Sequence, residues 1–112
     1  MADNQELKES LAKYTSKIND AALQGMAKTY ALVMSNKDSR FVSCGDASEK
    51  DTVRENFLKK KLSLKNSDGD LNAAIDDVCS KMKDDRFKNR VVFYYLLAEK
   101  YNLLGNFSKL ST

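Results

Sequence analysis

The stretch Val91–Ala98 reads VVFYYLLA and is the longest uninterrupted apolar run in the chain. On a helix, apolar side chains from this run and its flanks occupy every face, so that no continuous polar stripe remains. A helix that is apolar all round is buried on most of its sides. The run is too short to cross a bilayer, which requires about 20 residues. The sequence therefore predicts a core helix, and we expect no membrane partner.

The helix that contains this run is predicted to extend over Arg86–Leu104. Asp84 or Asp85 would cap its first turn by accepting a backbone N–H bond. Gly105 would end it, because glycine readily adopts the conformation found just past a helix end. Residues 105–112 are then expected to form a frayed tail, with Phe107 or Leu110 folded back onto the core as the alternative.

Four amphipathic segments precede this helix, each with apolar residues that recur every three or four positions. They are predicted at about residues 5–18, 21–35, 48–61 and 68–82. Side chains suited to capping stand before them, namely Asp3 or Asn4, Asn19, Ser48 and Ser67. Short connections between such helices predict a single all-α domain over residues 1–112, a bundle of about five helices around the C-terminal one.

The connection Asn36–Ala47 reads NKDSRFVSCGDA and is polar apart from Phe41 and Val42. These two residues would anchor it to the core as an ordered connection with a helical turn. A short extended piece is the alternative, although a lone strand has no partner in an all-α chain.

Composition narrows the possible chemistry. The 112 residues are 42% hydrophobic and 31% charged, which is normal for one globular domain. The chain has no histidine and only two cysteines, without a CxxC pair. These features exclude the usual zinc ligand sets and every histidine-dependent catalytic pair. The four scattered glycines form no phosphate-binding loop. We expect no cofactor and no enzymatic activity.

The two cysteines, Cys44 and Cys79, permit one disulfide, but a chain with a full core favours reduced thiols and a cytoplasmic location. The polar, acidic N-terminal residues are unlike a signal peptide. Cys79 shares an apolar face with Ile75 and Met82, which favours a structural role. Cys44 precedes a predicted helix N-terminus, where a thiol pKa can be lowered. Cys44 is therefore a candidate reactive thiol, with an ordinary loop cysteine as the simpler interpretation.

Basic residues are in excess only in the second half, where residues 51–112 carry 12 basic and 9 acidic side chains. We expect them to form one binding surface at the end of the third helix and the start of the last. Its members are Arg54, Lys59, Lys60, Lys61, Lys65, Arg86, Lys88 and Arg90. Several lysines and arginines on one face can bind nucleic-acid phosphates. The interspersed acids favour an ordinary solvated face.

Three segments resemble the uncharacterised family DUF2853 of short bacterial proteins. They are RENFLKKKL at residues 54–62, LNAAIDDVCSKM at 71–82 and KNRVVFYYLLAEK at 88–100. The resemblance implies a cytoplasmic, mostly helical protein, and it brings no activity, ligand or catalytic residue.

The sequence thus favours a non-enzymatic binding module whose partner is another protein. Nucleic-acid binding through the same basic surface is the first alternative. A thiol-based redox or enzymatic role at Cys44 is the second.

Overall fold

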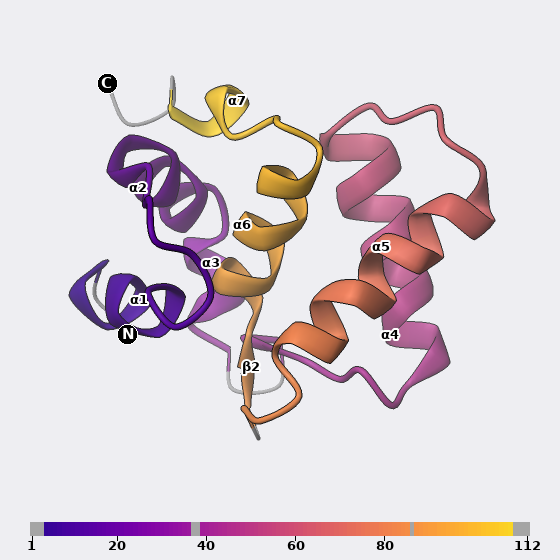
Figure 1. Ribbon diagram of the computed structural model, residues 1–112, viewed down its shortest axis with the longest axis horizontal. Coiled ribbons are helices and arrows are strands. Elements are labelled where there is room, and N and C mark those ends of the chain that lie inside the picture. Colours follow the sequence, from indigo (N-terminus) through magenta and orange to yellow (C-terminus); the bar gives the residue numbers. More distant parts are fainter. Residues whose placement is uncertain (1–3, 37–38, 86, 109–112) are drawn as a thin grey trace.

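The computed structural model of the chain describes residues 4–36, 39–85 and 87–108 (Figure 1). Within them lie seven α-helices, one π-helix and a two-stranded antiparallel sheet. In chain order the elements are α1 (Asn4–Leu11), α2 (Asp20–Thr29), α3 (Ala31–Met34), β1 (Phe41–Val42), α4 (Ala47–Thr52), η1 (Val53–Lys61), α5 (Asp68–Lys81), β2 (Lys88–Asn89), α6 (Arg90–Lys100) and α7 (Gly105–Ser108).

The helix α6 is the central element, and every residue from Arg90 to Ala98 is buried. In Figure 1 it lies between α1, α2, α3 and α7 on one side and α4 and α5 on the other. The apolar faces of the surrounding helices reach it through side chains such as Leu11, Leu23 and Ile75, all without exposed surface or nearly so. The prediction of an all-α fold around a buried C-terminal helix is confirmed.

The predicted bounds of this helix are wrong at both ends, because α6 begins at Arg90 and ends at Lys100. Its cap is Asn89, whose side chain accepts the backbone N–H groups of Val91 and Val92 at 2.9 and 3.2 Å. A cap residue has non-helical backbone. Asp84 and Asp85 therefore lie outside the helix that they were expected to begin.

The segment before α6 is extended because it has a strand partner in β1. Phe41 pairs with Asn89, and Val42 pairs with Lys88, in antiparallel register. The connection before α4 thus contains a short extended piece, Phe41–Val42, and the expectation that a strand there has no partner is wrong. The partner comes from residues that were predicted to be helical.

The first two predicted helices are shorter than expected. The helix α1 ends at Leu11 rather than near Ile18. The backbone forms a turn after Leu11, in which the N–H groups of Tyr14 and Thr15 both donate to the Leu11 carbonyl. The side chains of Tyr14 and Thr15 donate hydrogen bonds to the carboxylates of Asp85 and Glu99, which tie this turn to the rest of the molecule.

The second predicted helix is divided at Tyr30 into α2 and α3. The Tyr30 ring lies edge-on to Tyr94 at 5.0 Å between centroids and 6.2 Å from the ring of Phe57. Packing of this ring against α6 and η1 accompanies the break.

The third predicted helix exists as α4 followed by the π-helix η1. Its cap is Asp46, whose side chain accepts the Ser48 N–H at 2.9 Å, so the prediction of Ser48 as the cap is wrong. In η1 the backbone is wider than in an α-helix. At its end the Leu62 N–H donates to the Phe57 carbonyl at 2.9 Å, five residues back. The predicted caps Asn19 and Ser67 are confirmed for α2 and α5.

The predicted frayed tail over residues 105–112 is wrong in its first part. Gly105–Ser108 form α7, which packs on α2 (Figure 1). Phe107 is buried and stacks with Phe57 at 6.1 Å between ring centroids. Residues 109–112 lie outside the described residues.

Candidate functional site

The two basic stretches that were expected to share one surface lie apart. One stretch occupies the C-terminal end of η1 and the turn after it, and the other occupies β2 and the first residue of α6. In Figure 1 the chain leaves η1 at the top of the molecule, whereas β2 lies at the bottom. The single basic surface predicted from the sequence is therefore not formed.

Arg54 and Lys59 are engaged with acidic neighbours. Arg54 contacts Asp51 at 3.0 Å and Glu55 at 2.8 Å, and its side chain is 15% exposed. Lys59 contacts Glu55 at 2.9 Å and Asp68 at 2.6 Å. The hydrogen bond from Lys59 lowers the pKa of Asp68 below its ordinary value. These two cations are thus largely neutralised where they stand.

The remaining members of the predicted surface differ in exposure. Lys88 is half-buried, and its ammonium donates to the backbone carbonyl of Asp85 at 2.9 Å. Arg86 lies outside the described residues. Three lysines at the end of η1 and beyond it are exposed, namely Lys60, Lys61 and Lys65.

Arg90 is a buried structural residue rather than a surface contact, with 6% of its surface exposed. Its guanidinium donates to the backbone carbonyls of Ser39 and Phe41 and to the Tyr94 hydroxyl, the last at 2.9 Å. It also forms an ion pair with the carboxylate of Glu49. Burial raises the pKa of Tyr94. Arg90 thereby joins the segment before β1, the first turn of α4 and the core of α6.

Cys44 and Cys79 form a disulfide, with 5.9 Å between their Cα atoms. The expectation of reduced thiols is therefore wrong, and Cys44 is not a free reactive thiol in this structure. Sequence reasoning missed the bond because the two residues stand 35 positions apart. Only the packing of the β1–α4 connection against α5 brings them together.

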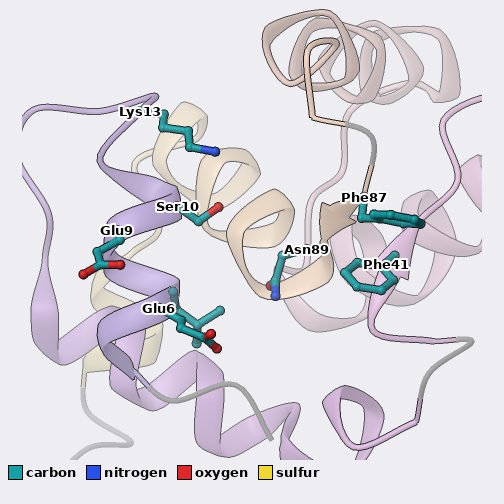
Figure 2. A pocket seen from close by; sticks show the side chains of 8 residues that line it. Glu6, Glu9, Ser10, Lys13, Phe41, Phe87 and Asn89 are labelled. Atoms are coloured by element: carbon teal, nitrogen blue, oxygen red, sulfur yellow. The ribbon is translucent and has the colours of Figure 1, made fainter.

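A groove of about 380 Å³ lies between α1 and the β1–β2 sheet (Figure 2). From α1 and the turn after it come Glu6, Leu7, Glu9, Ser10 and Lys13, and from the opposite side come Phe41, Phe87 and Asn89. Leu7 is 3% exposed and packs into the core, so it adds almost no open surface to the groove. The groove thus has charged and polar groups along the α1 wall and two phenylalanine rings on the opposite side.

The aromatic wall of this groove is exposed. Phe87 is 63% exposed, and its ring lies 5.2 Å from that of Phe41 between centroids. Figure 2 shows both rings on the side of the groove that faces α1 across Asn89. Phe41 was predicted to be an apolar anchor, but Phe87 was assigned to the last helix. Its position in the groove follows from β2, which the sequence did not reveal.

The charged end of the groove is tied to Asp85. Lys13 contacts the Asp85 carboxylate at 3.3 Å while its own side chain stays 60% exposed. The Tyr14 hydroxyl donates to the same carboxylate. This hydrogen bond, followed by the contacts from Lys13, lowers the pKa of Asp85. The turn after α1 is thereby fixed to the turn after α5.

Comparison with protein families identifies the chain. A family model described as "Protein of unknown function (DUF2853)" matches residues 5–104. The chain belongs to this family. The match runs from α1 to the turn after α6. The matched part of this DUF2853 protein therefore includes the residues on both walls of the groove and both cysteines. A search of curated proteins finds no match.

Among residues 4–36, 39–85 and 87–108, no three His, Cys, Asp or Glu side chains are grouped so that they could hold a metal ion. None of the helices in the described ranges has the length and apolar character needed to cross a bilayer.

Proposed function

We propose that this DUF2853 protein is a non-enzymatic interaction module that binds an extended segment of another protein in the groove between α1 and the β1–β2 sheet. The observation that carries the proposal is the exposure of Phe87, 63%, beside Phe41 and an open groove. Aromatic residues are enriched in protein contact surfaces. The exposed ring of Phe87, which lies against the half-buried Phe41 beside a groove, therefore fits a docking site better than a solvated face does.

The aromatic pair would supply most of the affinity. Burying a phenylalanine side chain completely contributes about 1.5–3 kcal/mol. An apolar partner side chain placed against the ring of Phe87 would remove much of the exposed surface of this ring from water. That burial corresponds to a roughly ten- to hundredfold gain in affinity.

The charges of the groove would set the direction of the bound segment. Figure 2 shows Glu6 at one end of the α1 wall and Lys13 at the other, with the hydroxyl of Ser10 between them. A segment with a basic residue near Glu6 and an apolar residue at the aromatic pair would complement the acidic end of the groove. An acidic residue at the other end would add less, because Lys13 already contacts Asp85. The reversed order would place like charges together.

Two synthetic peptides of opposite charge order test this proposal, each titrated into the labelled protein by nuclear magnetic resonance. The basic–apolar–acidic peptide is expected to shift the signals of Ser10, Phe41 and Phe87 and to bind more tightly than its reversal. Substitution Phe87→Ser should weaken binding roughly tenfold or more, because the apolar contact is lost.

Leu32→Ser is the matched control, because Leu32 is 86% exposed on α3 and is not among the residues that line the groove. It should leave peptide binding unchanged. Equal weakening by both variants, or no binding of either peptide, would contradict the proposal.

Nucleic-acid binding is the second candidate, and the exposure of Lys60, Lys61 and Lys65 favours it. It is weaker because Arg54 and Lys59 already have acidic partners and Arg90 is buried. Affinity for a fluorescent DNA duplex would fall steeply with salt and after Lys60→Glu and Lys61→Glu together. Indifference to both changes would exclude this function.

The cytoplasmic location predicted from the sequence stays a prediction. The disulfide removes one of its supports, because reducing compartments rarely contain disulfides. Alkylation of thiols at the moment of cell lysis, combined with fractionation, tests it. Recovery of the protein in the cytoplasmic fraction with both thiols alkylated would support a cytoplasmic location.

A further inference from the structure

We infer that the Cys44–Cys79 disulfide is a thiol–disulfide exchange site, which a dithiol reductant opens while the helical core stays folded. This inference is independent of the groove. It assigns a redox role to the bond itself, whereas the sequence suggested only a free thiol at Cys44. Its support comes from the position of the bond, the packing around it and the contacts on either side of it.

The bond is accessible to a reductant. Cys44 and Cys79 are both half-buried and lie at the edge of the core rather than inside it. The neighbours of Cys44 in the chain, Ser43 and Gly45, are exposed, and a Cβ atom added at Gly45 would meet no atom within 4 Å. Thiol–disulfide exchange requires that a thiolate reach one sulfur of the bond. The partial exposure of both cysteines offers that approach.

The segment around Cys44 is held on both sides by contacts that do not depend on the disulfide. Before it, Val42 is buried and pairs with Lys88 in the sheet. After it, Glu49 forms an ion pair with Arg90. Reduction should therefore release only residues 43–46, which lie between β1 and α4, and leave both elements in place.

A second link between the elements that the disulfide joins lies beside it. Lys50 of α4 contacts Asp76 of α5 at 2.8 Å. Asp76 stands three residues before Cys79, about one helical turn away. This ion pair keeps α4 near α5 after the bond opens, so that the two thiols stay within reach of each other and the bond can form again.

Atoms and electrons balance in the exchange between the dithiol and the Cys44–Cys79 bond, and no further reactant is needed. A thiolate of the dithiol attacks one sulfur of the Cys44–Cys79 bond, forms a mixed disulfide and releases the other cysteine as a thiolate, which takes up a proton. The second thiol of the reductant gives up its proton and displaces the cysteine that is still bound. Two electrons pass from the dithiol, which becomes a cyclic disulfide, and the protein gains two thiols.

The test uses the intact oxidised protein and dithiothreitol at neutral pH without denaturant. Free thiols are alkylated at intervals and counted by mass spectrometry, while circular dichroism follows the helices. We expect complete reduction at a rate within roughly tenfold of that for the urea-unfolded chain, with the helical signal unchanged, because attack needs no global unfolding. Removal of the dithiol and addition of oxidised glutathione should restore the bond in the monomer.

Hydrogen exchange locates the change. Reduction should increase exchange about tenfold or more in residues 43–46 and around Cys79, but not in α6, since local opening exposes only nearby amides. The double variant Cys44→Ser and Cys79→Ser should show the same pattern without any reductant. Reduction that needs denaturant, loss of helical signal on reduction, or increased exchange throughout α6 would each overturn the inference.

Discussion

Arg90 places a permanent positive charge in the core of a small domain. The charge is tolerated because the guanidinium has the carboxylate of Glu49, two backbone carbonyls and the Tyr94 hydroxyl as partners. A buried charge is costly unless it is paired and hydrogen-bonded. Arg90 therefore acts as a structural junction. Without its guanidinium, the Glu49 carboxylate and the two backbone carbonyls would lose a hydrogen-bond donor.

Substitution Arg90→Met tests this role, since methionine keeps an unbranched apolar side chain at the position and removes the charge. The partners of the guanidinium, Glu49 among them, would remain without it, so the free energy of unfolding should fall by about 3–5 kcal/mol. Urea denaturation followed by circular dichroism measures the loss.

Glu49→Gln is the companion variant. Glu49→Gln should lower the free energy of unfolding clearly less in the Arg90→Met variant than in the natural protein, because the ion pair is already absent from that variant. A loss below about 1 kcal/mol for Arg90→Met would show that the pair is not a structural junction.

The position of Arg90 illustrates what sequence patterns miss at this scale. Its partners Ser39, Phe41 and Glu49 lie 41 to 51 residues away in the chain. The spacing of apolar residues within a helix or strand gives no information about partners that lie so far away in the chain. An arginine at the start of an apolar helix therefore resembled a surface cation in the sequence and is a buried one in the structure.

Helix caps were predictable where the whole interaction is local. Asn19 and Ser67 each accept a backbone N–H three residues ahead, and the sequence identified both. The start of α6 was not predictable, because β2 exists only through its pairing with β1, more than 40 residues earlier. The same pairing places Phe87 in the groove. The approximate order of the helices could thus be predicted from the sequence, but the groove that forms the candidate site could not.

Asn89 is the junction between β2 and α6, and substitution Asn89→Ala should weaken that junction. Its side chain accepts two backbone N–H groups that have no partner within the helix. Loss of such a cap costs about 1 kcal/mol. Thermal and urea unfolding measure the change.

Asn89→Asp should restore most of the lost stability, since aspartate caps equally well. Asn56→Ala, at an exposed position in η1, is the control and should change stability by less than about 0.5 kcal/mol. Equal effects of Asn89→Ala and Asn89→Asp would contradict the capping role.

At the scale of the whole molecule, the disulfide closes a loop over 35 positions that contains α4, η1 and most of α5. In the chain-entropy model such a loop stabilises the folded state by about 4 kcal/mol. The double variant Cys44→Ser and Cys79→Ser should lose roughly this amount in urea denaturation. It should still fold, because the apolar core is continuous without the bond.

Each single cysteine variant should lose as much stability as the double one, since either removes the whole bond. Unchanged stability of the double variant under oxidising conditions would mean that the bond adds nothing to the folded state.

Acid should destabilise the molecule through several carboxylates together. Hydrogen bonds and nearby cations lower the pKa values of Asp46, Glu55, Asp68 and Asp85 from their ordinary values of 3.8 or 4.5. The unfolded chain therefore binds more protons than the folded one as the pH falls through these values. The stabilisation is complete above the ordinary pKa values and is lost as the pH falls through the lower folded ones.

Urea midpoints measured between pH 7 and pH 3 should be level at first and then fall below about pH 4.5. Asp85→Asn should flatten part of this fall, because its carboxylate has the bonds from Tyr14 and Lys13. A midpoint that does not change with pH would show that these pairs persist in the unfolded chain.

The central helix comes late in the chain, and this order matters while the protein is being made. The apolar faces of α1, α2 and α5 are only partly covered by earlier helices until residues 90–98 leave the ribosome. A nascent chain of the first 85 residues would expose the uncovered parts of these faces and attract chaperones. Folding would then be completed only when α6 emerges, so the domain should form nearly all at once at that point.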